Sequence, residues 1–258
     1  GVASVRELQN GNVLTMEYGG SMKIWDLRYE RNATKEGHRG IWGTLKTLNG
    51  SYLTCSPDTT VRIWNENGEE EAVFKAHSGG VRRAVELDNG NIVSLDQEGN
   101  LLWWERQYLS VVASHTISGR NGDLFKLKNG NVLAYRNAAS RAEVKLFSES
   151  AEELAVFEGD RYRKVRKVVL LKSGYVLIHV KDDEDGSIMI LWDERGVDIG
   201  EFQVDGDVNG IIEFNNGDMG FVLDEGSVQI WSLQRAQIAE IEVDHEKPFS
   251  VIELENGD

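Results

Sequence analysis

Short runs in which apolar and polar residues alternate recur along the whole chain, and polar turn residues separate them. Residues 41–77 contain four of these runs, and alternation with a period of two residues is typical of β-strands with one buried face. We expect strands at 41–48, 52–55, 61–64 and 72–74, joined by turns that contain Asn, Gly, Pro and Asp. This order predicts a four-stranded antiparallel meander.

The same pattern repeats along the chain, and an Asn-Gly or Ser-Gly pair marks each copy. The pairs begin at Asn10, Asn49, Asn89, Asn129, Ser173, Asn216 and Asn256, so by subtraction the spacings are 39, 40, 40, 44, 43 and 40 residues. Asn-Gly between two apolar runs is a strong hairpin signal, because both residues tolerate the positive φ of a type I′ turn. We therefore expect a type I′ hairpin between the first and second strands of every repeat.

The third run of each repeat carries an aromatic residue at one register. Five of the six copies have Trp and one has Phe, at Trp25, Trp64, Trp104, Phe147, Trp192 and Trp231. We expect these rings to pack between neighbouring sheets rather than to form a site. A small four-stranded sheet cannot bury both faces alone, whereas stacking such sheets around an axis buries them and leaves only short edges. The predicted fold class is all-β, a β-propeller of four-stranded antiparallel blades.

The repeat period predicts a single β-propeller domain over residues 1–258. Six complete repeats are expected at approximately 1–40, 41–80, 81–121, 122–164, 165–208 and 209–248. Residues 249–258 repeat only the first strand and form a partial seventh copy. A seven-bladed ring with an incomplete last blade is favoured over a six-bladed ring with one strand left over. In the favoured case the chain belongs to a larger protein or complex.

Composition and charge narrow the classes of partner and compartment. The formal net charge is −15, from 43 acidic and 28 basic residues. A field of this sign repels nucleic acid and anionic membrane surfaces, and it favours a basic protein or peptide as the partner. The single cysteine, Cys55, excludes an intrachain disulfide, and no apolar run is long enough to span a membrane. We expect a cytoplasmic protein.

One repeat contains polar residues suited to a linked hydrogen-bond network, namely Gly37-His38, Thr54, Asp58 and Trp64-Asn65. These residues resemble the repeat of the WD-repeat propeller family, which has Gly-His, Ser or Thr, Asp and Trp-Asp in this order. An indole N–H only donates, so Trp64 needs the Thr54 hydroxyl as its acceptor. That hydroxyl can donate to His38, whose second ring nitrogen can donate to Asp58.

The other repeats match this motif less completely. The next repeat keeps three residue types and has a glutamate where the aspartate is expected, at His77, Ser94, Glu98 and Trp104. In the fifth and sixth repeats Ile178 and Phe221 occupy the hydroxyl position. The resemblance implies a scaffold or adaptor, often one domain of a longer regulatory protein. It indicates no individual member of the family.

Arginine and aromatic residues are expected together on the rim that carries the loops between repeats. They are Arg39, Trp42, Arg82, Arg83, Arg120, Arg161, Tyr162 and Arg163, with Tyr18 and Arg136 from turns between second and third strands. Trp, Tyr and Arg are enriched in interface hot spots. These residues are therefore candidates for binding a partner. The alternative is that each arginine pairs with a carboxylate and Trp42 packs between first strands.

Two other classes of function stay open beside a non-enzymatic scaffold. An enzyme would need His, Asp or Glu to converge in a central channel, but most of the five histidines fall at one position per repeat. Asp205, Asp207 and Asn209 fit the beginning of a calcium loop, although its twelfth position is Asn216 instead of Glu. The sequence thus favours a scaffold without catalytic residues, metal or cofactor over an enzyme or a calcium- or ligand-sensing module.

Overall fold

The computed structural model describes residues 2–7, 11, 13–17, 19, 21–26, 31–36, 38–65, 67–137, 142–159, 163–182 and 186–242. Within these residues all regular secondary structure is β-strand, so no helix in them is long and apolar enough to cross a membrane. The predicted partial repeat at 249–258 lies outside the described residues. The choice between six and seven blades therefore stays open.

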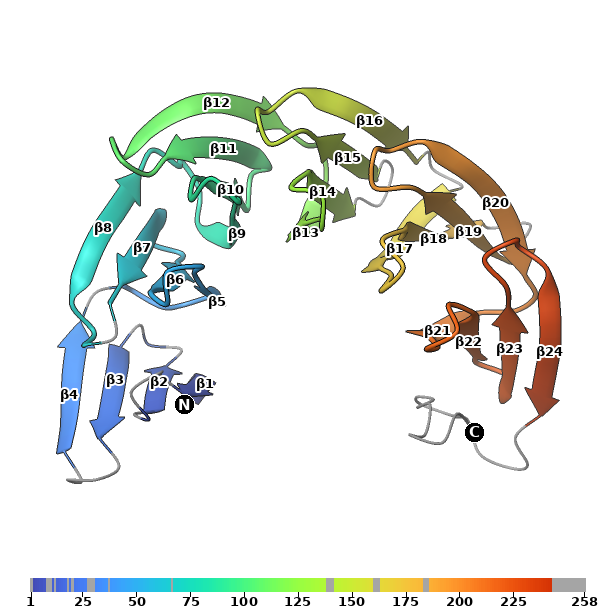
Figure 1. The fold of residues 1–258 in the computed structure, drawn as a ribbon, viewed down its shortest axis with the longest axis horizontal. Helices are drawn as coiled ribbons and strands as arrows, with labels where there is room; N and C mark the ends of the chain where they lie inside the picture. Colours follow the sequence, from blue (N-terminus) through green and yellow to red (C-terminus); the bar gives the residue numbers. More distant parts are fainter. Residues whose placement is uncertain are drawn as a thin grey trace. The chain divides into compact units, whose positions relative to one another are not determined.

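The described strands form six four-stranded sheets, labelled in Figure 1. The first contains β1 (Val2–Glu7), β2 (Val13–Glu17), β3 (Ser21–Asp26) and β4 (Arg31–Glu36). The second contains β5 (Gly43–Lys46), β6 (Tyr52–Cys55), β7 (Thr60–Trp64) and β8 (Glu70–Lys75). The third contains β9 (Val81–Glu86), β10 (Ile92–Asp96), β11 (Asn100–Glu105) and β12 (Ser110–Thr116).

The remaining three sheets follow the same plan. The fourth contains β13 (Arg120–Lys126), β14 (Val132–Asn137), β15 (Glu143–Phe147) and β16 (Glu153–Glu158). The fifth contains β17 (Arg163–Leu170), β18 (Val176–Asp182), β19 (Gly186–Trp192) and β20 (Asp198–Val204). The sixth contains β21 (Val208–Glu213), β22 (Met219–Leu223), β23 (Ser227–Trp231) and β24 (Gln237–Glu242).

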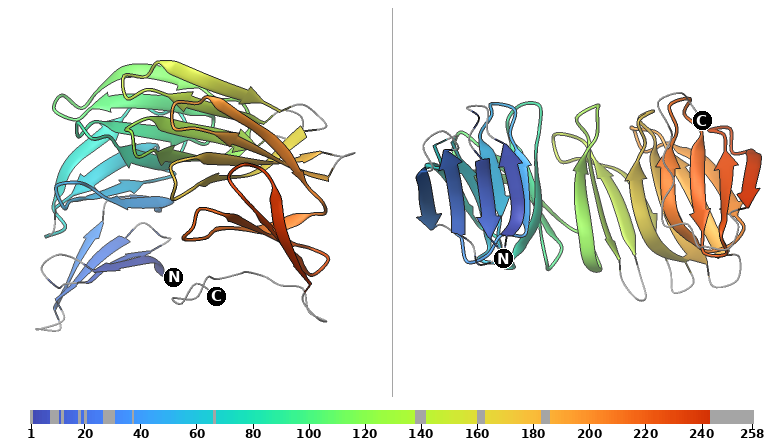
Figure 2. Two further views of the ribbon diagram at one scale, coloured as in Figure 1. Left: turned by 45° about the vertical axis from the view of Figure 1, so that its right-hand side comes forward. Right: turned by 90° about the horizontal axis from the view of Figure 1, so that it is seen from below.

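Strands that follow one another in sequence lie side by side in each sheet, as two further views show (Figure 2). Pairing is antiparallel in the first, second, third, fifth and sixth sheets. The predicted four-stranded meander is therefore confirmed. The strand expected at 41–48 is shorter than predicted, because the turn of the first hairpin already begins at Thr47.

The chain divides into two compact units, which are described separately. The first comprises residues 1–126, 130–136 and 147–153, and the second comprises 127–129, 137–146 and 154–258. In the first unit the Trp104 ring lies 5.3 Å from Phe74, which joins the second and third sheets. In the second unit Trp231 stacks on Phe202 at 4.9 Å. Aromatic packing between neighbouring sheets is thus present within each unit, while a single propeller domain over 1–258 stays a prediction.

In the second to sixth sheets the turns between first and second strands occur where expected but are not of type I′. The Gly50 N–H donates to the Thr47 carbonyl at 3.0 Å, and Gly50 has a φ of +92° whereas Asn49 has no positive φ. This geometry is a type I turn followed by a glycine bulge. The Asn49 Oδ1 atom accepts from the Thr47 hydroxyl at 2.6 Å and from the Ser51 N–H at 3.3 Å. Asparagine therefore serves as a hydrogen-bond acceptor here, and only the glycine carries the left-handed conformation.

Candidate functional site

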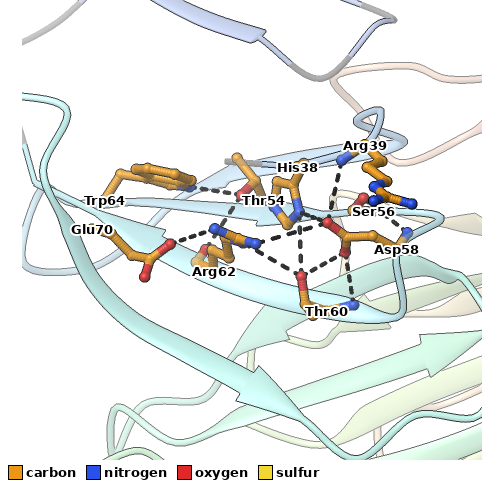
Figure 3. A network of polar contacts seen from close by, with 9 residues as sticks. All are labelled: His38, Arg39, Thr54, Ser56, Asp58, Thr60, Arg62, Trp64 and Glu70. Atoms are coloured by element: carbon orange, nitrogen blue, oxygen red, sulfur yellow. Dashed lines mark hydrogen bonds and ion pairs between the residues drawn. The ribbon is translucent and has the colours of Figure 1, made fainter. Parts of the chain in front are cut away.

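A hydrogen-bond network crosses the second sheet from the third strand to the residues that precede the first (Figure 3). The Trp64 Nε1–H donates to Thr54 Oγ1 at 2.8 Å. Thr54 Oγ1 lies 2.7 Å from His38 Nε2, and His38 Nδ1 lies 3.0 Å from Asp58 Oδ2. Since a carboxylate only accepts, Nδ1 carries the proton and Nε2 accepts from Thr54. The linked contacts predicted for these four residues are confirmed.

The electrostatics of this network fit a structural role. Burial lowers the pKa of His38 below its ordinary value, although Asp58 acts in the opposite direction, so the ring is neutral at pH 7. Burial alone would raise the pKa of Asp58, but hydrogen bonds from Thr60 and His38 outweigh it and lower the pKa to about 2. A neutral imidazole between a hydroxyl and a carboxylate satisfies every polar group in the chain of bonds.

The third sheet has an equivalent network with a different acid. Trp104 Nε1–H donates to Ser94 Oγ at 2.7 Å, and Ser94 Oγ lies 2.6 Å from His77 Nε2. His77 Nδ1 lies 3.1 Å from Asp96 Oδ2, whereas Glu98 accepts from the Ser78 hydroxyl at 2.6 Å. The prediction that Glu98 completes this network is wrong. The β9–β10 register shifts between Leu95 and Asp96, and Asp96 also accepts the N–H groups of the following turn.

Other sheets keep only part of the network. In the first sheet Trp25 Nε1–H donates to Thr15 Oγ1 at 2.8 Å. In the sixth sheet, where Phe221 replaces the hydroxyl residue, Trp231 Nε1–H donates to Gln229 Oε1 at 3.2 Å. Each pair or network lies within one sheet and its preceding loop. Across the described residues no group of three or more His, Cys, Asp or Glu side chains is arranged to hold a metal ion.

Two of the three residues that begin the considered calcium loop, Asp207 and Asn209, have side-chain partners within the protein. Asp207 pairs with Lys181, and the Asn209 amide donates to Asp224. Glu213 lies in β21 and accepts from the Ser173 N–H at 2.9 Å. The segment from Val208 to Glu213 is thus a strand, and its Asn209 and Glu213 side chains have partners in the same unit.

Three of the predicted partner-binding residues come together in the first unit. Trp42 immediately precedes β5 and is 45% exposed. The Arg82 guanidinium lies over its ring, with the guanidinium carbon 5.7 Å from the ring centroid. Arg83 Nε–H donates to Asp123 Oδ1 at 2.7 Å. Together with Gly122, these side chains line a cavity of about 410 Å³.

Among the other predicted partner-binding residues, the structure describes the side chains of Arg39 and Arg136. Arg39 is exposed, and its backbone N–H donates to Asp58 Oδ2 at 3.3 Å. Arg136 is only 2% exposed, and its guanidinium donates to the carbonyls of Gln97 at 2.6 Å and Ile117 at 3.4 Å. The prediction of an exposed Arg136 is wrong, because two backbone carbonyls draw this side chain inward. Tyr18, Arg161 and Tyr162 lie outside the described residues, as do the side chains of Arg120 and Arg163.

The sequence analysis missed a feature that three residues of this cavity, Trp42, Arg82 and Gly122, share. In the first, third, fifth and sixth sheets, pairing of the first and second strands skips one residue. The skipped residues are Ala3, Arg82, Arg166 and Asn209, and each lies seven positions before the turn residue at 10, 89, 173 or 216. Trp42 and Gly122 occupy the same position relative to Asn49 and Asn129. A β-bulge redirects the side chain that it carries. The constant interval was the signal that could have identified this position.

In the second unit the same position lines a separate polar cavity. Arg166 and Asn209 surround it together with His179 and Lys181, and its volume is about 270 Å³. His179 is buried, and burial together with the charge of Arg166 lowers its pKa to about 4. This imidazole is therefore neutral at pH 7. Lys181 is already paired with Asp207, and Arg166 is the one guanidinium that lines this cavity.

The chain is similar in sequence to known proteins over part of its length. No family model matches the chain. Over 80 residues, 31% of this chain and 3% of the relative, it is 31% identical to the "Telomerase protein component 1" of Rattus norvegicus. Over 66 residues, 24% of this chain and 15% of the relative, it is 38% identical to the "Ribosome biogenesis protein WDR12 homolog" of Trichoplax adhaerens.

The chain therefore spans only a small part of the length of these curated relatives. The WD-repeat designation in the second name agrees with the resemblance drawn from His38, Thr54, Asp58 and Trp64. The repeated four-stranded antiparallel sheets are consistent with a β-propeller. Together these findings make the chain similar to WD-repeat proteins without identifying an individual member.

Proposed function

We propose that this protein is a non-enzymatic interaction scaffold or adaptor that binds a protein or peptide through the surface formed by Trp42, Arg82 and Arg83. One observation carries the proposal: a half-exposed tryptophan and two arginines line a single cavity. Trp and Arg dominate interface hot spots, because each combines a large contact area with directional polar groups. The names of the two relatives, a ribosome biogenesis protein and a telomerase protein component, are compatible with such a role.

The proposal includes a propeller architecture and a cytoplasmic location. It also includes the absence of nucleic-acid and membrane partners, which the net charge of −15 supports through long-range repulsion of polyanions. A central-channel enzyme is a weaker alternative, because the histidine networks of the described residues are bonded within their own sheets.

Capture of partners from the native cell tests the proposal. The immobilised wild-type chain is compared with the double variant Trp42→Ala/Arg83→Glu, and the captured proteins are identified by mass spectrometry. Tyr108→Ala/Lys75→Glu is the matched control, because it removes another exposed aromatic residue and reverses another exposed charge. We expect the first double variant to lose the enriched partner and the control to retain it. Circular dichroism and the urea midpoint confirm that both remain folded. A folded Trp42→Ala/Arg83→Glu protein that still captures the same partner refutes the assignment.

A further inference from the structure

The positive charge of Arg82 is not balanced by the described residues around it. Its guanidinium stacks over the Trp42 ring, and its Nε atom is buried without a hydrogen-bond acceptor among the described residues. A buried donor without an acceptor is costly, so a group that supplies an acceptor is favoured at this place. The bulge at Arg82 directs this side chain toward the cavity that Trp42 and Gly122 also line.

The neighbouring arginines are already engaged. Arg83 donates to Asp123, which raises the pKa of the Arg83 guanidinium. Arg136 donates to two backbone carbonyls from a buried position. The charge of Arg136 is close enough to Arg82 to act on it electrostatically, and it is of the same sign. Among these three arginines Arg82 is therefore the one that can pair with an incoming anion.

The shape of the cavity complements this charge. Glycine occupies the repeat position in the next sheet, and a Cβ atom at Gly122 would lie 2.2 Å from the Tyr135 carbonyl oxygen and 2.5 Å from Arg136 Cγ. A larger residue cannot be accommodated there without displacing the backbone. The cavity is thus bounded by an aromatic face, a guanidinium and a position without a side chain.

We infer that this cavity binds the carboxylate of an aspartate or glutamate side chain from a partner peptide, with Arg82 as the pairing residue and Trp42 contacting the adjacent apolar part of the peptide. The inference rests on the proposed function and names the chemistry of the partner. A planar guanidinium fork matches a carboxylate with two parallel hydrogen bonds. The Coulomb attraction within such a pair is stronger beside an indole ring than in open water.

A carboxylate fits better than a phosphate group. One unengaged guanidinium balances a single negative charge, whereas a phosphate brings nearly two. Asp123 accepts from Arg83, so the charge of Arg83 is already balanced and does not add to that of Arg82. The cavity thus favours an acidic side chain, whereas the net charge of −15 favours a basic partner. The two differ because short-range pairing depends on nearby groups and not on the total charge.

A random dodecapeptide library displayed on phage, selected on the immobilised full chain, tests the inference. Among the binders that compete for the same site, we expect Asp and Glu to be enriched next to apolar residues. The best binder is then synthesised with its acidic residue intact and with the Glu→Gln or Asp→Asn change. We expect the neutral peptide to bind about tenfold more weakly or worse, as measured by calorimetry.

Variants of the protein assign the effect to one residue. Arg82→Gln should weaken binding of the acidic peptide by a similar factor and leave binding of the neutral peptide almost unchanged. The change in the protein and the change in the peptide together should therefore reduce affinity no more than either change alone. Arg82→Lys keeps the charge but loses the fork, so it should bind with intermediate affinity. Lys75→Gln removes an exposed charge elsewhere and should change nothing.

The outcomes separate this inference from the proposed function. Binders that need Trp42 but show no enrichment of Asp or Glu, or that are unaffected by Arg82→Gln, overturn the carboxylate assignment and leave the interaction surface in place. A preference for phosphoserine over glutamate in the synthetic peptide also overturns it. Selection that yields no binder above background counts against the inference. If the folded Trp42→Ala/Arg83→Glu variant also still captures the partner, that counts against the surface itself.

Discussion

At the scale of single residues, the histidine networks are the contacts whose energetic role is easiest to test. His38 is buried, and its two ring nitrogens contact Thr54 and Asp58. His38→Ala leaves the fully buried Thr54 hydroxyl and the Asp58 carboxylate without this partner. We expect the free energy of unfolding to fall by about 1–3 kcal/mol, measured from the urea midpoint. An unchanged midpoint would mean that water or other groups replace the imidazole at no cost.

The residue scale also shows what spacing can and cannot predict. The WD-repeat motif predicted a bond between the Trp64 indole and the Thr54 hydroxyl, and its next copy keeps Trp104 and Ser94; the structure contains both indole–hydroxyl bonds. The acid of the second network was missed, because Asp96 and Glu98 are both close to the expected position and only the strand register selects between them. Burial of Arg136 depends on carbonyl groups of a neighbouring sheet, which no local pattern reveals.

At the scale of elements, the hairpin glycines carry a conformation that other residues adopt at a cost. Gly90 has a φ of +81°, and a Cβ atom there would have no neighbour within 4 Å. The cost of Gly90→Ala is therefore conformational, and we expect a loss of about 1 kcal/mol in unfolding free energy. Gly19→Ala is the matched control, since its Cβ would also be in open space and its φ is not in the left-handed region. Equal midpoints for the two variants would contradict the turn geometry.

Strand order and strand positions could be predicted because alternation and turn residues are local properties of the sequence. The type of turn could not, since Asn-Gly suits both a type I′ turn and a type I turn with a glycine bulge. The bulges at Arg82, Arg166 and Asn209 were also missed, because a bulge depends on pairing with the second strand. Their constant distance from the turns shows that the repeat period contained this information.

At the scale of the whole molecule, total charge and local charge have opposite consequences for binding. The net charge of −15 acts over distances of about a Debye length and slows the approach of acidic partners. Arg82 acts only on groups that reach the cavity. A partner with one acidic side chain in an otherwise neutral or basic segment satisfies both conditions. The expected basic partner and the inferred carboxylate contact can therefore belong to one peptide.

The prediction of a single domain over residues 1–258 is tested by following both compact units after a change in one of them. Phe74 is fully buried in the first unit, and Phe74→Ala should cost about 3–5 kcal/mol. Stacked repeats are coupled through their nearest neighbours, so in one domain the loss should reach the amides of β22 and β23 in the second unit as well as those of β6 and β7. Hydrogen exchange followed by mass spectrometry reports both regions in one experiment.

Val112→Ala, at an exposed position of β12, is the control and should alter neither region. Faster exchange confined to the first unit would show that the two units unfold independently and that the single-domain prediction is wrong.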